Sequence, residues 1–209
     1  MIIGIIGSGN IGSTVARLAV ASGHDVIISH SRGPESLRDL VAALGAHARA
    51  GTAEQAARDG DIVLIAIPFR DRAALFQSGI DLRGKVVVDA MNAYNADFTL
   101  MDLKGMGSSE IVAQELPGAR VVKAFNTLYS KTLASAARPK GSTERIVLPV
   151  ASDDADAKRI VSNFIDSIGY DPLDDGSLVD GRRQQPETAL YNKPLSVRQA
   201  QALMGSVRS

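Results

Sequence analysis

The chain has 209 residues, of which 45% are hydrophobic and 22% charged, and its 23 basic side chains equal its 23 acidic ones. This balance is typical of a soluble globular protein and argues against intrinsic disorder and against a nucleic-acid partner. The absence of cysteine excludes disulfides, thiolate metal sites and thiol nucleophiles, and no apolar run approaches the roughly 18 residues of a membrane span, so we expect a cytoplasmic protein without a membrane partner.

Short apolar runs rich in β-branched residues recur along the chain and predict strands that are buried on both faces. These runs are residues 2–6, 26–28, 62–67, 86–88, 121–125 and 146–150. Between several of them the apolar spacing becomes helical, as in residues 37–44 and 157–168. The alternation predicts an α/β fold of the Rossmann type, with a doubly wound, mostly parallel sheet and helices on both faces.

We expect residues 1–209 to form a single domain, because no internal repeat, low-complexity block or linker interrupts residues 1–175. After Asp175 the composition becomes rich in turn-forming residues and loses its periodicity. Residues 176–209 are therefore predicted to be a short C-terminal tail with one short helix, from Ser196 to about Met204.

Three glycines directly after the first predicted strand form the pattern G-x-G-x-x-G and open a predicted helix, which is the setting of a dinucleotide-binding loop. Gly7 permits a tight turn, Gly9 lets a pyrophosphate approach the backbone, and Gly12 lets the helix pack closely on the strand. Ser8 and Asn10 can add hydrogen-bond donors around the same phosphates. The alternative is an ordinary strand-to-helix turn without a ligand.

The end of the second predicted strand indicates which dinucleotide is bound. An NAD-binding loop places an acid there for the ribose 2′-hydroxyl, but residues 26–32 contain none. They offer Ser31 and Arg32 instead, and a guanidinium and a hydroxyl suit a 2′-phosphate, so we expect NADP(H). His30 or Arg38 can add positive charge. The alternative for Arg32 is a solvated surface arginine.

Residues that follow the later strands should lie on the same rim, because the carboxyl ends of parallel strands line the ligand crevice. The predicted cofactor-facing residues here are Ala66, Ile67, Pro68 and Asn92, and the predicted substrate-facing residues are Asn126, Thr127 and Tyr129. Asp89 and Lys123 reach the same rim, where a turn cap and a surface charge are the structural alternatives. The histidines lack metal-ligand spacing and no G-x-S-x-G elbow occurs, so we expect no metal and assign no catalytic residue.

The segments GSGNIG, HSRGPE, AIPF, VVDAMN, KAFNTLY and LPVASDDADAK occur in this order. Over roughly residues 1–175 the sequence resembles the NADPH-dependent coenzyme F420 reductases, also called F420H2:NADP+ oxidoreductases. The resemblance implies that nicotinamide and deazaflavin stack at the ends of the central strands. It also implies a pyrophosphate site at Ser8, Gly9, Asn10 and Ile11, a 2′-phosphate site at Ser31 and Arg32, and a position beside the cofactor for Ile67. Reductase domains of membrane ferric reductases, which pass electrons to flavin, are similar too.

We therefore expect hydride transfer between NADP(H) and a ring-type acceptor, which for this family is the deazaflavin F420. One alternative is an NADPH-dependent reductase of flavin, quinone or a small carbonyl or imine, and another is a non-catalytic NADPH sensor. Only the 34 residues after Asp175 remain for a further domain, too few for the helical domain of longer relatives. The substrate is thus expected in an open cleft or one completed in a homodimer.

Overall fold

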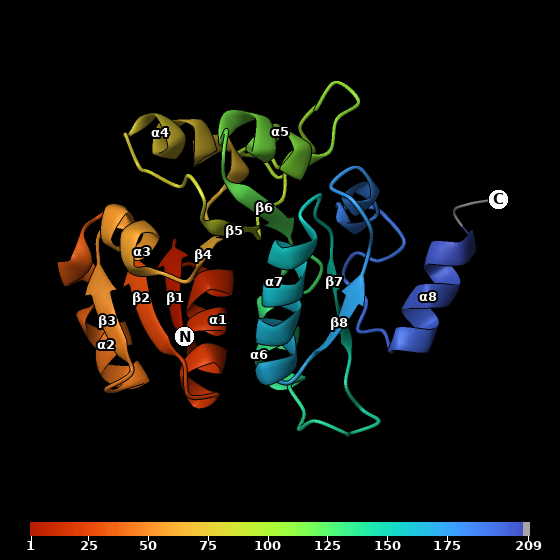
Figure 1. The fold of residues 1–209 in the computed structure, drawn as a ribbon, viewed down its shortest axis with the longest axis horizontal. Helices are drawn as coiled ribbons and strands as arrows, with labels where there is room; N and C mark the ends of the chain where they lie inside the picture. The colour runs from red at the N-terminus through yellow and green to blue at the C-terminus, as the bar shows by residue number, and fades with distance from the viewer. Residues whose placement is uncertain (207–209) are drawn as a thin grey trace.

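A six-stranded parallel sheet organises residues 2–123 in the computed structural model, which describes residues 1–206 (Figure 1). The strand order is β3-β2-β1-β4-β5-β6. The strands are β1 (Ile2–Ile6), β2 (Asp25–Ser29), β3 (Ala48–Gly51), β4 (Ile62–Ile65), β5 (Val86–Asp89) and β6 (Arg120–Lys123). The predicted Rossmann-type, doubly wound sheet is confirmed. From β1, the chain adds β2 and β3 on one side and then β4, β5 and β6 on the other, so the strand order reverses between β1 and β4.

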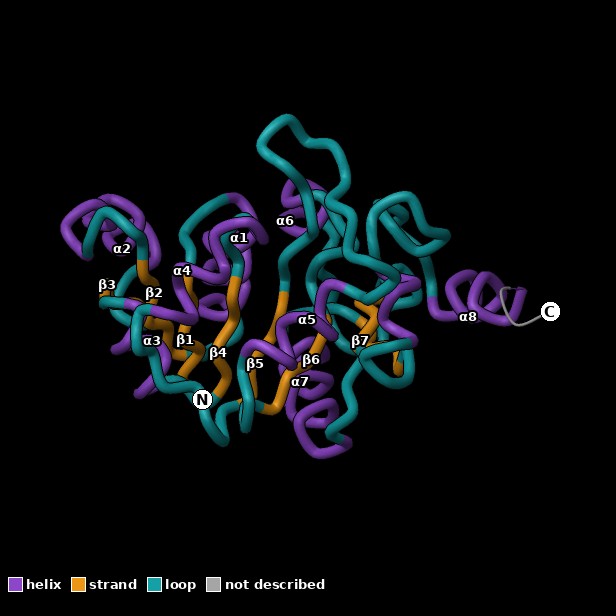
Figure 2. The backbone as a smooth tube through the Cα atoms, turned by 90° about the horizontal axis from the view of Figure 1, so that it is seen from above, coloured by secondary structure: helices purple, strands orange, loops and turns teal. Residues whose placement is uncertain are grey.

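Helices cover both faces of this sheet, as the view from above shows (Figure 2). One face packs against α1 (Asn10–Ala21), α2 (Arg38–Leu44), α6 (Ser130–Ser135) and α7 (Ala155–Ser167). The other packs against α3 (Ala53–Asp59), α4 (Arg72–Gln77) and α5 (Ser108–Glu115). Apolar side chains on both faces explain why the strands read as unbroken hydrophobic runs.

Two strands form a second, smaller parallel sheet, β7 (Val147–Val150) and β8 (Asp171–Asp174). An isolated antiparallel bridge between Lys123 and Ala151 joins it to the end of β6. The run 146–150 was thus correctly predicted as a strand, but the sequence DPLD of β8 gave no strand signal. Its proline and flanking acids are poor strand formers, which an edge position tolerates.

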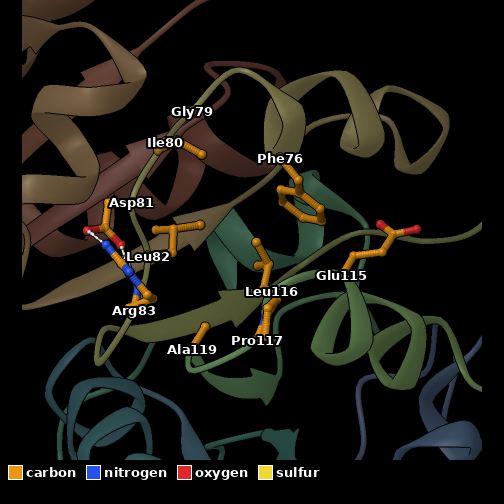
Figure 3. Close-up of a pocket in the computed structure, with 10 residues that line it drawn as sticks. All are labelled: Phe76, Gly79, Ile80, Asp81, Leu82, Arg83, Glu115, Leu116, Pro117 and Ala119. Atoms are coloured by element: carbon orange, nitrogen blue, oxygen red, sulfur yellow. Dashed lines mark hydrogen bonds and ion pairs between the residues drawn. The ribbon is translucent and has the colours of Figure 1, made fainter.

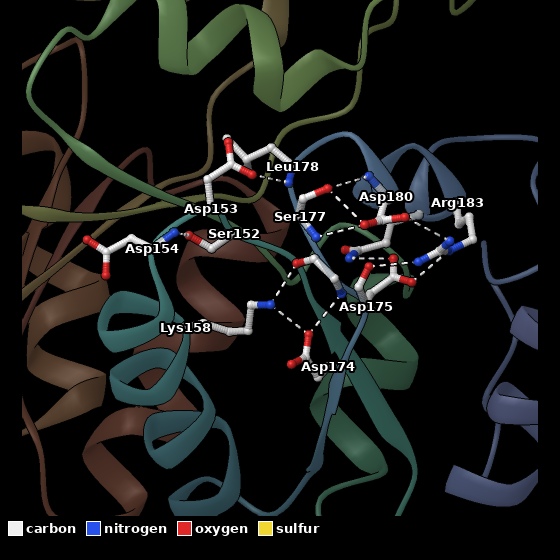
Figure 4. A network of polar contacts seen from close by, with 12 residues as sticks. Ser152, Asp153, Asp154, Lys158, Asp174, Asp175, Ser177, Leu178, Asp180 and Arg183 are labelled. Carbon is white, nitrogen blue, oxygen red and sulfur yellow. Dashed lines mark hydrogen bonds and ion pairs between the residues drawn. The ribbon is translucent and has the colours of Figure 1, made fainter.

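The C-terminal tail is more ordered than its composition predicts. The expected helix is present as α8 (Val197–Ser206), and a short 3-10 helix, Asp180–Gln184, precedes it. Figure 4 shows the polar network that holds the start of the tail, in which the Arg183 guanidinium donates to Asp175 Oδ1 at 2.9 Å. Burial raises the pKa of Asp175, and Arg183 and Gln184 offset this by hydrogen bonding to the carboxylate.

A buried ion pair joins the carboxyl ends of β5 and β6, where Asp89 and Lys123 are register neighbours. Lys123 Nζ lies 3.2 Å from Asp89 Oδ2 and donates to the Met91 carbonyl at 2.6 Å, while the Ser109 hydroxyl donates to Asp89 at 2.6 Å. The Asp89 side chain is 0% exposed and the Lys123 side chain 1%. Lys123 is therefore not the surface charge that its sequence context allowed; it shapes the loop that leaves β5.

We predict that Asp89→Ala lowers the free energy of unfolding by about 3 to 5 kcal/mol, because it leaves a buried lysine unpaired. The double variant Asp89→Ala/Lys123→Met should recover most of this loss in urea titrations. Burial already lowers the pKa of Lys123 below its ordinary value of 10.5. Because the unfolded chain then binds more protons than the folded one, the deficit of Asp89→Ala should shrink as the pH rises toward that value. An equal deficit at every pH would contradict the unpaired-charge explanation.

Candidate functional site

A cleft of about 500 Å³ lies where the strand order reverses, at the carboxyl ends of β1, β2 and β4. Ligands bind in doubly wound folds at this point. The structure brings many of the predicted cofactor residues into its lining, namely Gly7, Ser8, Gly9, Ser31, Ala66, Ile67 and Pro68. Sequence reasoning missed Asp71, Ala74 and Leu75, which also line the cleft, because neither α4 nor its N-cap residue Asp71 belongs to a nucleotide-binding motif.

The three glycines of the loop differ in what surrounds them. Gly7 has a φ of +105°, and a Cβ there would stand 2.4 Å from the Ala66 carbonyl oxygen. A Cβ on Gly12 would stand 1.9 Å from the Gly7 carbonyl oxygen. Around Gly9, by contrast, a Cβ would meet nothing within 4 Å. Gly7 and Gly12 are thus required by packing and backbone conformation, whereas Gly9 leaves open space beside the backbone.

The first turn of α1 is open to an anion. Gly9 is its N-cap residue, without a side-chain capping bond, and the first turn carries no acidic residue. The N–H groups of Asn10, Ile11 and Gly12 have no acceptor within the helix, as in the first turn of any α-helix. Together with the helix dipole they favour negative charge at this end of the cleft.

Positive charge follows β2. Ser31 lines the cleft, and both Ser31 and Arg32 are exposed. The Arg32 backbone N–H donates to His30 Nδ1 at 2.9 Å, which fixes the turn. Within residues 1–206, the Arg32 and Arg38 guanidinium groups have neither a hydrogen-bond partner nor an ion-pair partner. The carboxylate among the lining residues is that of Asp71, which lies 3.9 Å from Arg70 Nε.

The predicted substrate residues lie together beyond β5 and β6, next to Asn92. Asn92 Nδ2 donates to the Asn126 carbonyl and Asn126 Nδ2 donates to Asn92 Oδ1, both at 3.0 Å. Asn126 also donates to the Gln184 carbonyl at 2.7 Å, and the Thr127 carbonyl accepts from the Asn192 N–H. Asn126 is 3% exposed, yet its Oδ1 has no hydrogen-bond partner in the part of the chain described.

The tail therefore completes this part of the rim, a contribution that sequence reasoning missed because residues 184 and 192 lie in a segment without periodicity. Thr127 is buried, so its backbone rather than its hydroxyl meets the tail. Tyr129, by contrast, is 67% exposed at the start of α6.

A second cavity, of about 270 Å³, lies at the opposite end of the sheet, before β5 and β6 (Figure 3). It is lined by apolar residues such as Phe76, Ile80 and Leu116, with the Asp81–Arg83 ion pair at its edge. Hydrogen bonds from Arg83 lower the pKa of Asp81 to about 2. Because parallel sheets bind ligands at the carboxyl ends of their strands, this cavity is not the candidate site.

Among residues 1–206, no group of three or more His, Cys, Asp or Glu side chains is placed to hold a metal ion. In the same part of the chain, no helix combines the length and the apolar character needed to cross a membrane.

Comparison with known proteins gives consistent matches. A hypothetical protein, SMa0349, from Sinorhizobium meliloti is 39% identical, with a TM-score of 0.84 over 92% of this chain and 93% of that one. A protein provisionally assigned as an F420-dependent NADP reductase, from Arthrobacter sp. FB24, is 26% identical, with a TM-score of 0.74 over 85% and 86% of the two chains.

The chain is also 28% identical to Metalloreductase STEAP3 of Rattus norvegicus over 86% of its own length, but it spans only 35% of that protein. The model of the family described as NADP oxidoreductase, coenzyme F420-dependent, matches residues 2–93, which include the glycine loop, Ser31, Arg32 and the end of β4. Residues 2–93 of the chain therefore match the family of coenzyme F420-dependent NADP oxidoreductases, and over most of its length the chain is similar to the Arthrobacter protein.

Proposed function

We propose that this chain is an NADP-dependent oxidoreductase that transfers hydride between NADP(H) and a ring-type acceptor, and that this acceptor is a deazaflavin. The observation that carries the proposal is the pairing of an open glycine loop with an unpaired Arg32 and the lack of an acid in residues 26–32. The family match over residues 2–93 supports the cofactor. The assignment given to the Arthrobacter protein supports the acceptor.

The pyrophosphate would lie against Gly9 and the first turn of α1. Open space at Gly9 and the free N–H groups of Asn10 and Ile11 fit an anion there. Ser8 is half-buried in the lining and adds a hydroxyl donor. Gly7 and Gly12 contribute by keeping the loop close to β4 and α1, not by contacting the ligand.

The 2′-phosphate would be held by Ser31 and Arg32. A free guanidinium binds a phosphate in a two-pronged, charge-assisted fork, and the adjacent hydroxyl donates a further bond. Arg38 adds positive charge from the start of α2. NAD(H) would leave this pair without a partner, since its adenosine ribose carries a hydroxyl there.

The nicotinamide would extend along Ala66, Ile67 and Pro68 toward Asn92 and Asn126. Bound there, the nicotinamide supplies the hydride chemistry, and the protein needs to orient the ring and exclude water. The hydrogen bonds between Asn92 and Asn126 would hold the loops after β5 and β6 in place at that end. No side chain is required as nucleophile or acid, because the nicotinamide carries the hydride.

We predict that Arg32→Ala weakens the binding of NADP+ but not of NAD+. Loss of the charge-assisted bonds to the 2′-phosphate should weaken NADP+ binding about 10-fold to 100-fold, at roughly 1.5–3 kcal/mol for hydrogen bonds to a charged group. NAD+ binding should be unchanged in calorimetric titration. Arg159→Ala, an exposed arginine on α7, is the matched control. Equal weakening of both nucleotides would mean that Arg32 contacts a part that they share.

We predict that Gly9→Ala lowers NADP+ affinity, whereas Gly12→Ala lowers the stability of the fold. Gly9 has an ordinary extended backbone with open space around it, so its methyl group should leave thermal stability unchanged but obstruct the pyrophosphate, weakening NADP+ binding about tenfold or more. Gly12→Ala should destabilise the fold itself through the contact with the Gly7 carbonyl. Tight NADP+ binding by folded Gly9→Ala protein would exclude a close approach of the pyrophosphate at this loop.

We predict that the chain prefers a 5-deazaflavin over flavin as its ring-type reactant. The purified full chain should reduce NADP+ rapidly with a chemically reduced 5-deazaflavin, and more slowly with NAD+ as acceptor or with free reduced flavin as donor. Initial rates at 340 nm measure this. Fast reaction with flavin alone would replace the deazaflavin by flavin, an acceptor also expected from the resemblance to ferric reductases. Tight NADPH binding without turnover of either ring would reject the proposed activity.

A further inference from the structure

Three of the chain's four tyrosines and one phenylalanine gather at the ends of β5 and β6. Tyr94 and Phe98 come from the loop after β5, Tyr129 from the loop after β6, and Tyr191 from the tail. The Tyr94 and Phe98 rings are 6.5 Å apart, and the Tyr94 and Tyr191 hydroxyls are 3.4 Å apart. Burial raises the pKa of Tyr191, with smaller contributions from Tyr94 and then Tyr129, as expected for neighbours. We call these four residues the aromatic wall.

The loop that carries Tyr94 and Phe98 holds its phenylalanine outward. Phe98 is 81% exposed and has a φ of +64°, a conformation that is uncommon for a bulky residue. Polar contacts rigidify the turn: the Asn95 side chain donates to the Thr99 hydroxyl at 3.0 Å, and the Thr99 hydroxyl donates to Asp97 at 2.7 Å. Backbone strain with a large exposed apolar side chain is typical of segments that contact a ligand or partner.

The aromatic wall adjoins Asn92 and Asn126, toward which the nicotinamide is proposed to extend. The Tyr94 N–H donates to the Asn92 carbonyl, and the Asn192 N–H, next to Tyr191, donates to the Thr127 carbonyl. The hydrogen bonds between Asn92 and Asn126 thus connect the two loops that carry Tyr94 and Tyr129. A dinucleotide that enters at β1 and β2 would direct its nicotinamide toward these strands, so the second reactant approaches from β5 and β6.

We propose that the aromatic wall binds the planar ring system of the electron acceptor by stacking, with Phe98 and Tyr129 as its exposed contacts. This rests on the proposed function, because it assigns the acceptor to the same rim as the nicotinamide. Aromatic faces suit a flat conjugated ring, because the two ring systems can stack. A small carbonyl or imine would leave most of this surface uncovered, so the wall selects for ring-type acceptors.

The test is equilibrium binding of 5-deazariboflavin to the full chain in saturating NADP+, followed by fluorescence anisotropy. Both reactants are oxidised, so no hydride moves and binding is measured independently of turnover. Phe98→Ala and Tyr129→Ala should each weaken ring binding about three- to tenfold while NADP+ affinity stays unchanged. Tyr129→Phe, which keeps the ring, and Val179→Ala, an exposed apolar residue outside the wall, should bind like the wild type.

The outcomes separate this inference from the proposed function. If the wild type binds the ring through the wall but transfers no hydride to NADP+, the proposed function fails and the wall stands. If hydride transfer occurs with an unchanged KM for the ring in both alanine variants, the wall is overturned and the function stands. Loss of a dimer in Phe98→Ala by sedimentation, with ring binding unaffected, would also overturn the proposal, by identifying the wall as an interface between two copies.

Discussion

Close backbone packing around β1 is the constraint on which the rest of the structure depends. Added Cβ atoms would stand 2.1 Å from the Ala56 carbonyl oxygen at Gly4, and 2.4 Å from that of Ala66 at Gly7. A Cβ on Gly12, in α1, would stand 1.9 Å from the Gly7 carbonyl oxygen. Strand β1 therefore holds α3, the end of β4 and the start of α1 at distances that no side chain allows. The width of the cleft and the aim of the first turn of α1 follow from these approaches.

Beyond β4 the architecture depends on polar contacts instead. The buried pair of Asp89 and Lys123 fixes how the chain leaves β5 and β6, and the pair of Asn92 and Asn126 then ties the two exits together. The tail joins through backbone groups of Gln184 and Asn192. Buried polar contacts of this kind cost desolvation, so they add less to stability than to the choice of one arrangement.

Much of the nucleotide-binding half could be predicted from sequence, because its signals are local. The glycine spacing, the apolar runs and the missing acid before Arg32 each reflect a constraint that neighbouring residues satisfy. β3 and β8 were not recognised, since the small residues of ARAG and the acids of DPLD carry no strand pattern and pair only because a neighbouring strand offers an edge. The burial of Lys123 and the docking of residues 184 and 192 depend on contacts between distant segments, which no local pattern reports.

The close-packed elements around β1 and the loops beyond β5 and β6 can diverge at different rates within the family. The family match ends at residue 93, directly after Asn92, whereas the aromatic wall begins at Tyr94 and is built from loops and the tail. Loops accept substitutions and insertions more readily than the close-packed elements around β1. Relatives can therefore keep the glycine loop and the close packing around β1 while exchanging the loops after β5 and β6, where we propose that the electron acceptor binds.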